Sequence, residues 1–572
     1  MALKKPMKNK SQENNTPSFL KGFRPHIIIL IITAIIYSHT LGFKFTYLDD
    51  NKLILDNFHF ISRISNIIEA FKHDVFIDTT NNAYYRPIMT ISLILDAYLG
   101  GTSPLFYHLT NIIIHYLCSC LVFIFLLKLG YQRFPSFISS LFFTVHPALC
   151  QAVSWIGGRN DTLLAFFILL SIITLISYLN TRKTTKLLIH LLTFTLAIFT
   201  KETALVFFFL YIFISIIMHK KIFERQNISI FTSYLIIILL WYFMRKNALS
   251  NPLNYTSKDI INSIINNFPA ILLYIGKTLL PFNLSVLPIL SDNTLIWGYI
   301  VVVISIFLVS FSKNKNSLYM IFGIFWFIIF LLPAFIRPNS NLPADFIEHR
   351  IYLPIIGFII FLLEAGNIKN IEFKINFLNI AILAILFLFS IINISYSYNF
   401  KDGISFWENA QRHSPSYPLA RRNLGAMYYL RGELDKAEKE YLECLKLNPT
   451  EPMVHNNLGL IYMNRGEFKK AEEEFLMELK YYPNYDTAYY NLALLYLRQS
   501  KTNEAVNLFK KTIEINPYYF DAYEKLSLIF YTLNDFKQSK FYIDEALKRN
   551  GKINPEIIKM VEQSIHHIER KK

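Results

Sequence analysis

Apolar segments of helical length fill the first 400 residues, and this feature restricts the fold of the chain more than any other. The first, residues 25–43, is long enough to cross a bilayer, for which a helix needs about 20 mainly apolar residues. Ten further candidates follow, at about 106–128, 134–153, 161–179, 187–200, 203–218, 228–244, 295–311, 318–336, 351–364 and 376–396. We therefore predict an all-α, polytopic membrane domain of about eleven spans over residues 25–400.

Composition excludes several other classes of protein. Charged residues are only 17% of the chain and hydrophobic residues 53%, whereas a soluble protein has about 25% charged residues. This balance excludes a disordered chain and a simple soluble enzyme. Four cysteines are too few for a disulfide scaffold. The net charge of +16 comes almost entirely from the first 400 residues. Loops beside membrane spans are the expected place for it, and we expect no nucleic-acid partner.

The basic residues also predict the orientation in the membrane. If the tail 1–24 is cytoplasmic, every cytoplasmic loop is basic, as the positive-inside rule requires. The run 267–290 contains Pro269, Pro281 and Pro288, and we interpret it as re-entrant or interfacial, because a full span there would turn later basic loops outward. Residues after 396 then lie outside. The loop residues are Lys128 and Arg133; Arg182, Lys183 and Lys186; Lys220, Lys221 and Arg225; Lys313 and Lys315; and Lys369 and Lys374.

A period of 34 residues dominates the C-terminal part. Leucines recur at this spacing, at Leu424, Leu458, Leu492 and Leu526, and so do small, aromatic and proline residues. This pattern is typical of tetratricopeptide repeats, in which pairs of helices stack into a solenoid. We predict four repeats over 418–553, then a capping helix and basic tail over 554–572. Trp407 and Pro415 continue the register backwards, so 401–417 is interpreted as a half-repeat connector.

One asparagine occupies the same position in three of these repeats. Asn423, Asn457 and Asn491 are 34 residues apart, so they are expected to line one face of the solenoid. An amide can both donate to and accept from a peptide backbone. We predict that these residues bind an acceptor polypeptide in the solenoid groove. The alternative is that asparagine is simply common at this position of such repeats.

A pair of acidic residues follows the first span. Asp49 and Asp50 lie in the segment YLDDN, at the start of a large first outside loop, 44–105. Carboxylates at a membrane surface are costly unless they are bound or used. A carboxylate with a raised pKa can act as general base and accept a proton from a hydroxyl group. The alternative is a helix cap or a solvated pair.

Four cations fall at the predicted outside ends of spans. They lie in the segments YYRP, HPALCQAVSWIGGRND, TKE and EHRIYLP, and they are Arg86, Arg159, Lys201 and Arg350. Cations gathered on one face of a membrane suit a lipid-linked phosphate, which arginine can hold through two hydrogen bonds. Each of them alone could instead extend its charge from an apolar position to the interface. No spacing of His, Cys or acidic residues predicts a metal site.

These segments, in this order, resemble the transmembrane and tetratricopeptide-repeat (TMTC) O-mannosyltransferases and their bacterial relatives, of the GT-C glycosyltransferase superfamily. The resemblance extends over about residues 25–553. It implies a GT-C-like membrane domain followed by repeats, with Asp49 and Asp50 as the catalytic pair. It also implies a polyprenyl-phosphate sugar as donor, mannose in the eukaryotic members, and a protein hydroxyl as acceptor.

The implied reaction is a single displacement that inverts the sugar at its anomeric carbon. Polyprenyl phosphate is a tolerable leaving group, so the lipid-linked sugar phosphate is the donor substrate and no cofactor is obligatory; the need for a divalent metal is left open. The alternatives are a non-catalytic membrane-anchored repeat scaffold and an O-antigen-ligase-like glycan transferase. We expect an integral protein of a bacterial inner membrane with periplasmic repeats, or of an endomembrane with luminal repeats if it is eukaryotic.

Overall fold

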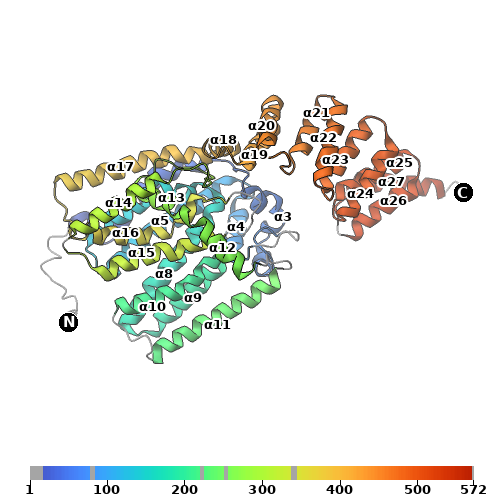
Figure 1. Ribbon diagram of the computed structural model, residues 1–572. Coiled ribbons are helices and arrows are strands. Elements are labelled where there is room, and N and C mark those ends of the chain that lie inside the picture. Colours follow the sequence, from blue (N-terminus) through green and yellow to red (C-terminus); the bar gives the residue numbers. More distant parts are fainter. Residues whose placement is uncertain are drawn as a thin grey trace. The chain divides into compact units, whose positions relative to one another are not determined.

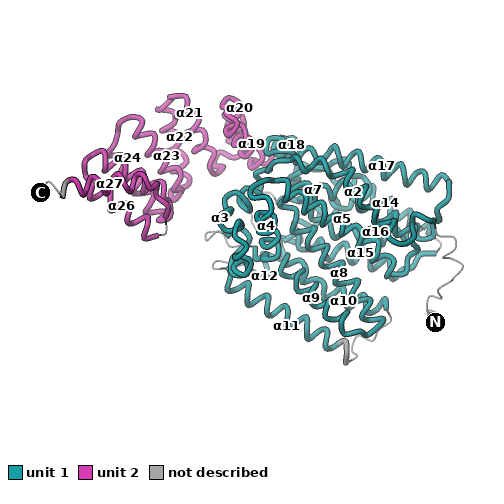
Figure 2. The backbone as a smooth tube through the Cα atoms, turned by 180° about the vertical axis from the view of Figure 1, so that it is seen from behind, with its two compact units in different colours: residues 1–415 teal, residues 416–572 magenta. Residues whose placement is uncertain are grey.

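The protein is helical throughout the part that its computed structural model describes, which is residues 17–77, 84–218, 225–249, 255–312, 314–336, 344–366, 368–549 and 551–569. These residues contain no β-strand and a single β-bridge, between Ile289 and Asp345. The chain divides into two compact units, residues 1–415 and 416–572 (Figures 1 and 2). The prediction of an all-α fold is confirmed. Most of the predicted cytoplasmic tail, together with Lys220, Lys221 and Lys313, lies outside the described residues.

Every one of the eleven predicted spans coincides with a helix. Within the described residues, six stretches are long and apolar enough to cross a membrane. Helix α6 with α7 (Cys150–Ser154) makes a seventh if this pair, bent by 54°, is one span. The number eleven therefore stays a prediction. The helices are α2 (Arg24–Tyr37), α5 (Pro104–Lys128), α6 (Arg133–Val145), α8 (Arg159–Thr181), α9 (Thr184–Thr200), α10 (Phe207–Ile217), α11 (Arg225–Ala248), α14 (Ile296–Phe311), α15 (Ser317–Leu331), α16 (Pro354–Ala365) and α17 (Phe377–Ser397).

Two helix pairs in the first unit are built on glycine contacts. In α13 (Ile271–Leu279) and α14, a Cβ on Gly298 would lie 2.2 Å from the carbonyl oxygen of Leu272. In α15 and α16, a Cβ on Gly323 would lie 2.5 Å from the carbonyl oxygen of Gly357. Small residues allow helix backbones in membranes to approach closely. Helix α13 has nine residues, too few to cross a bilayer as a helix.

The loop 44–105, predicted to lie outside, folds around a hydrophobic core. Its helices are η3 (Asn51–Asp56), α3 (Phe58–Ile61), η4 (Ile64–Ile67), η5 (Glu69–Lys72) and α4 (Pro87–Gly100). Residues of this loop, among them Leu53, Ile61 and Leu93, are buried together with Tyr107 of α5 and Ile156, just before α8. The core thus fixes the loop to the N-terminal part of α5 and to the residues just before α8. A further helix, α12 (Ser257–Asn267), follows α11.

The predicted connector is a helix of the first unit. Helix α18 (Gly403–His413) buries Phe406 and Trp407. Asn409 of this helix accepts a hydrogen bond from the Val286 amide at 3.1 Å, and the hydroxyl of Ser414, directly after the helix, donates to the Leu287 carbonyl at 2.7 Å. These bonds attach α18 to the segment between α13 and α14.

The second unit consists of four helix pairs and a final helix. Small residues allow the two helices of a pair to approach: a Cβ on Gly425 would lie 2.7 Å from the Tyr441 ring, and a Cβ on Gly459 the same distance from the Phe475 ring. The predicted repeat architecture is confirmed. The helices are α19 (Pro418–Leu430), α20 (Leu434–Leu447), α21 (Val454–Asn464), α22 (Phe468–Tyr481), α23 (Asp486–Arg498), α24 (Thr502–Ile515), α25 (Phe520–Thr532), α26 (Phe536–Lys548) and α27 (Pro555–Glu569).

Candidate functional site

The two aspartates after the first span have different environments. Asp50 is buried, and its carboxylate accepts four hydrogen bonds: from the Thr46 amide at 2.7 Å, the Thr46 hydroxyl at 3.0 Å, the Tyr47 amide at 2.8 Å and the Asn51 amide at 3.1 Å. Tyr47 has a left-handed backbone, with φ at 59°, which is strained for a residue with a large side chain. Asp50 therefore caps η3 and holds the preceding turn in its strained conformation.

Asp49 is partly accessible to solvent, although protein surrounds it. Within the described residues its carboxylate accepts no hydrogen bond. Burial raises the pKa of Asp49 to about 6, and the like charges of Asp50 and Asp345 act in the same direction, while Arg86 and Lys52 oppose them. Such a carboxyl is ionised at neutral pH and basic enough to accept a proton. Asp49 is thus the one of the two whose environment suits a general base.

Among the cations, Arg86 lowers the pKa of Asp49 most. Its guanidinium donates to Glu202 at 3.0 Å and lies 4.5 Å from the centre of the Tyr84 ring. The side chain is largely buried, and its Nε atom has no hydrogen-bond partner among the described residues. An unpaired buried donor is costly, so Arg86 retains a donor that a bound anion could use.

A second group of charges joins three of the quoted segments. Lys201 Nζ lies 2.8 Å from both carboxylate oxygens of Asp161, and His349 Nε2 lies 3.5 Å from one of them. The His349 ring packs against Trp155, with the ring centres 5.3 Å apart. Asp161 lies in the first turn of α8, Lys201 follows α9 and His349 lies in η11 (Glu348–Ile351). The structure brings these distant segments together, and Lys201 already has a carboxylate partner.

Arg350 also has a carboxylate partner. Its guanidinium donates to the Asp345 carbonyl at 2.7 Å and to the Asp345 carboxylate at 2.8 Å. The charge of Asp345 in turn affects the pKa of Asp49. Arg350 therefore fixes an acidic residue near the candidate base.

Arg159, unlike the other three cations, is fully buried and surrounded by its own bonding partners. Its Nη1 lies 2.5 Å from the Asp96 carboxylate, its Nε donates to Asn111 at 2.8 Å and its Nη2 donates to the Tyr107 carbonyl at 2.6 Å. These partners connect α4, α5 and α8. Its environment favours a structural ion pair over the predicted phosphate contact.

Four residues of the site were not singled out as site residues from the sequence: Asp161, Glu202, His349 and Asp345. The first three lie inside the quoted segments, next to cations that were selected, so their charge and position were available as a signal. Asp345 has no such signal, because only the fold brings it near Asp49. Among the described residues, no group of three His, Cys, Asp or Glu could hold a metal ion.

The three predicted acceptor-binding asparagines are not equivalent. Asn491 is buried and donates to the Asn456 side chain at 2.8 Å, whereas Asn423 and Asn457 are partly accessible. The regular spacing therefore does not produce a uniformly open ladder. Acceptor binding by these residues stays a prediction, with Asn491 the least available of the three.

Comparison with known families supports the repeats directly. A model described as "TPR repeat" matches residues 425–466, and models described as "Tetratricopeptide repeat" match 487–519 and 520–553. Solved structures are similar over a small part of the chain. The crystal structure of MamA is 22% identical, with a TM-score of 0.24, over 26% of this chain and 86% of that one. A structure of Pseudomonas aeruginosa pilF is 20% identical, with a TM-score of 0.26, over 29% and 75%.

Relatives of known name extend the similarity into the membrane domain. A Caenorhabditis elegans protein named protein O-mannosyl-transferase F38B6.6 is 26% identical in an alignment of 465 residues that covers 75% of this chain and 63% of the relative. The chain is TMTC-like. Protein O-mannosyl-transferase Tmtc1 of Drosophila melanogaster is 28% identical over 30% of this chain and 20% of its own length, and mouse TMTC2 is 30% identical over 26% and 18%. The TMTC-like chain thus matches less than two thirds of the length of these relatives. The apolar helices and this similarity together identify the chain as an integral membrane protein.

Proposed function

We propose that this protein is an inverting membrane glycosyltransferase that moves a sugar, mannose or one like it, from a polyprenyl-phosphate donor to a hydroxyl of a protein or peptide. The observation that carries the proposal is the environment of Asp49: a partly accessible carboxylate that follows the first predicted span, with a pKa that burial raises and the charge of Arg86 opposes. The names of the relatives support the reaction class.

In the proposed reaction Asp49 accepts the proton of the acceptor hydroxyl, while the oxygen of that hydroxyl attacks the anomeric carbon of the sugar. The bond from that carbon to the phosphate oxygen breaks on the opposite face, so the configuration inverts. The transition state gains positive charge on the sugar, as in glycoside hydrolysis. Asp50 acts as a positioning residue, because it holds the turn that carries Asp49.

The departing phosphate needs positive charge, which lowers the barrier most when it is preorganised. Of the four predicted cations, Arg86 is the best candidate, since its Nε donor is unpaired within the described residues and its charge reaches Asp49. Lys201 and Arg350 each have a carboxylate partner and are proposed as supporting charges. Arg159 is left out of the donor site because it is fully enclosed in its own ion pair.

The repeats are proposed to bind the acceptor polypeptide, with Asn423 and Asn457 as the accessible contacts. We place them in the periplasm of a bacterial inner membrane, or in the lumen if the protein is eukaryotic. The basic loops predicted to be cytoplasmic support this orientation. No obligatory cofactor is proposed, and lipid-linked sugar phosphate is the donor substrate.

The test is sugar transfer by the purified protein in liposomes, with polyprenyl-phosphate mannose and an unfolded acceptor polypeptide. Asp49→Asn should lower the rate by about 10²–10⁴-fold, the usual effect of losing a general base. Asp56→Asn is the matched control, because Asp56 is an exposed aspartate of the same loop. Transfer at an equal rate by wild type and Asp49→Asn would exclude Asp49 as the base. Failure of wild type to transfer from any lipid-linked sugar would favour a non-catalytic scaffold.

A further inference from the structure

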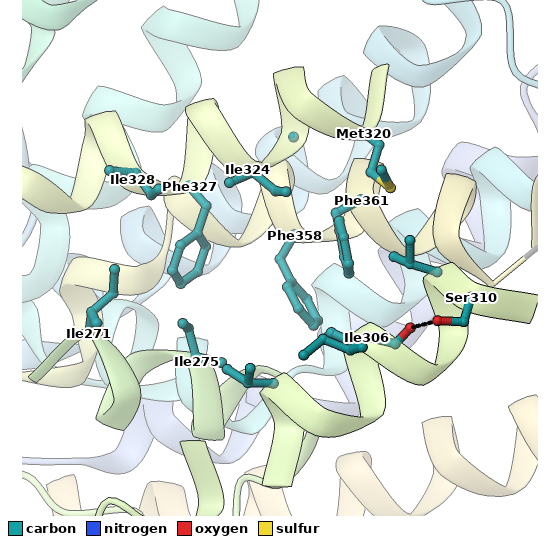
Figure 3. Close-up of a pocket in the computed structure, with 14 residues that line it drawn as sticks. Ile271, Ile275, Ile306, Ser310, Met320, Ile324, Phe327, Ile328, Phe358 and Phe361 are labelled. Atoms are coloured by element: carbon teal, nitrogen blue, oxygen red, sulfur yellow. Dashed lines mark hydrogen bonds between the residues drawn. The ribbon is translucent and has the colours of Figure 1, made fainter. Parts of the chain in front are cut away.

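The first unit has an apolar groove of about 450 Å³ between α13, α14, α15 and α16 (Figure 3). Its lining residues carry no charge, and the hydroxyl of Ser310, one of the polar side chains among them, donates to the Ile306 carbonyl at 2.9 Å. Such a lining offers apolar contact alone, which ordinary membrane lipid also satisfies, so it specifies no ligand. The junction of the first two repeats, in contrast, holds a titratable side chain with specific partners.

His455, in the first turn of α21, lies between two hydrogen-bond acceptors. Its Nδ1 is 2.7 Å from the Glu474 carboxylate, and its Nε2 is 3.2 Å from the Pro449 carbonyl. A neutral imidazole has one N–H group, whereas the imidazolium ion has two. Neither an ionised carboxylate nor a carbonyl can donate a proton. Both contacts are therefore hydrogen bonds only when His455 is protonated.

The preceding repeat has a permanent cation at the same position. Arg421 is 34 residues before His455, and its guanidinium donates to Glu440 at 2.8 Å. Glu440 is likewise 34 residues before Glu474. The two repeats thus carry the same ion pair, with arginine in one and the titratable histidine in the other. The third and fourth repeats have uncharged residues at the two positions: Tyr489 with Leu508, and Tyr523 with Tyr542.

The start of α21 also depends on a second glutamate of α22. Glu478 is buried and accepts hydrogen bonds from the amides of Met453 at 2.8 Å and Asn456 at 3.1 Å. Met453 has a left-handed backbone, with φ at 72°, which is strained for a residue other than glycine. Glu474 and Glu478 are four residues apart on one helix, so their like charges repel each other. Protonated His455 offsets this repulsion, and neutral His455 does not.

The groups that face His455 are mainly acidic. The Tyr481 ring of α22 lies 5.7 Å from the His455 ring. Burial lowers the pKa of His455, but Glu474, the Pro449 carbonyl and Glu478 outweigh it and raise the pKa above the ordinary 6.5. Charges on the other elements packed against α21 have partners of their own: Arg422 with Glu451 at 3.0 Å, Glu438 with Arg465 at 2.6 Å, and Asp486 with Asn516 at 2.6 Å.

We propose that His455 is a pH-dependent lock at the junction of the first and second repeats. Protonated, it bonds the first turn of α21 to α22 and to the loop that follows α20; neutral, it gives up one of these bonds, and the turn loosens. Because the pKa is raised in the folded protein, the stabilisation is complete below pH 6.5 and is lost as the pH rises through the raised value. Helix α21 also carries Asn457, so acceptor binding, if it occurs as proposed above, should weaken over the same range.

The test is hydrogen–deuterium exchange of the full-length protein in detergent, measured by mass spectrometry and corrected for the intrinsic pH dependence of amide exchange. Protection of α21 should be about three- to tenfold higher at pH 5.5 than at pH 8.5, the net effect of about one hydrogen bond. Helix α25, where Tyr523 occupies the equivalent position, should show no such change and serves as the internal control.

Three variants separate the lock from a general effect of pH. His455→Arg reproduces the cation of the first repeat and should keep α21 protected at both pH values. His455→Gln should show the lower protection at both. Arg421→His is the matched variant of the first repeat and should transfer the pH dependence to α19.

Equal protection of α21 at the two pH values in folded wild type would overturn the proposal, and so would a pH dependence that persists in His455→Gln. If His455→Gln does not fold, Glu474→Gln replaces it, and a pH dependence as large as that of wild type would then overturn the proposal. The measurement uses neither donor nor acceptor, so its result is independent of the proposed sugar transfer.

Discussion

Replacing each aspartate of the acidic pair by asparagine should have opposite effects on the stability of the protein. Asp49→Asn removes a carboxylate that accepts no hydrogen bond from the described residues and whose ionised form is disfavoured by burial and by Asp50 and Asp345. Asp50→Asn removes a carboxylate that accepts four hydrogen bonds. Both variants should lose sugar transfer, but for different physical reasons.

The size of each effect follows from these environments. The pKa of Asp49 is raised from 3.8 to about 6, so the ionised carboxylate destabilises the folded state at pH 7. Since one pKa unit corresponds to about 1.4 kcal/mol, Asp49→Asn should stabilise the fold by about 1–3 kcal/mol. In Asp50→Asn the amide nitrogen must face two donors, and each hydrogen bond lost should cost about 1–3 kcal/mol. Burial raises the pKa of Asp50 as well, so removal of its charge should offset part of that cost.

The assay is thermal unfolding of both variants in detergent at pH 7 and pH 4. At pH 7 Asp49→Asn should melt above wild type and Asp50→Asn below it. A raised pKa destabilises only where the carboxylate is ionised, so the gain of Asp49→Asn should nearly vanish at pH 4. Asp49→Asn that melts as far below wild type as Asp50→Asn would refute the division of roles. A gain that is independent of pH would refute the electrostatic explanation.

Three further predictions follow from the same geometry. The transfer rate should rise with pH through about 6, where Asp49 loses its proton, and a pH–rate profile that rises near pH 4 instead would show that Asp49 is not perturbed in the working enzyme. Arg159→Leu should destabilise the protein by about 3–5 kcal/mol, because it leaves Asp96 as a buried unpaired charge. Arg86→Gln should fold normally and raise KM for the lipid donor. A destabilised Arg86→Gln and a stable Arg159→Leu with a raised KM would exchange the two roles. The four native cysteines are buried, so a cysteine introduced at the exposed Lys552 should react with an impermeant thiol reagent from the outside face only.

Much of the architecture could be predicted because it depends on patterns within the sequence itself. The 34-residue period fixes the helix pairs of the second unit, and the small residues at Gly425 and Gly459 meet aromatic rings as the pattern requires. Apolar runs identify the membrane helices. Their number remains open, because a bent pair such as α6 and α7, or a helix of fewer than 18 residues, does not satisfy a simple length criterion.

The roles of individual site residues could not be predicted in the same way. Asp49 and Asp50 are neighbours of identical chemistry, and only the fold shows that the donors of Thr46, Tyr47 and Asn51 all point at Asp50. Arg86 and Arg159 differ because a carboxylate on α4 reaches Arg159 from 63 positions away in the sequence. Partners that are distant along the chain decide whether a charge is structural or available.

The central claim is a single displacement on a lipid-linked sugar with Asp49 as base, and the configuration of the product tests it most directly. The measurement is nuclear magnetic resonance of the glycosylated acceptor peptide, made by purified wild type from polyprenyl-phosphate mannose of known anomeric configuration. The account predicts a product in which the anomeric carbon has the opposite configuration to the donor, absent from the Asp49→Asn reaction. A product with the donor's configuration, or the same inverted product at an undiminished rate from Asp49→Asn, would contradict it.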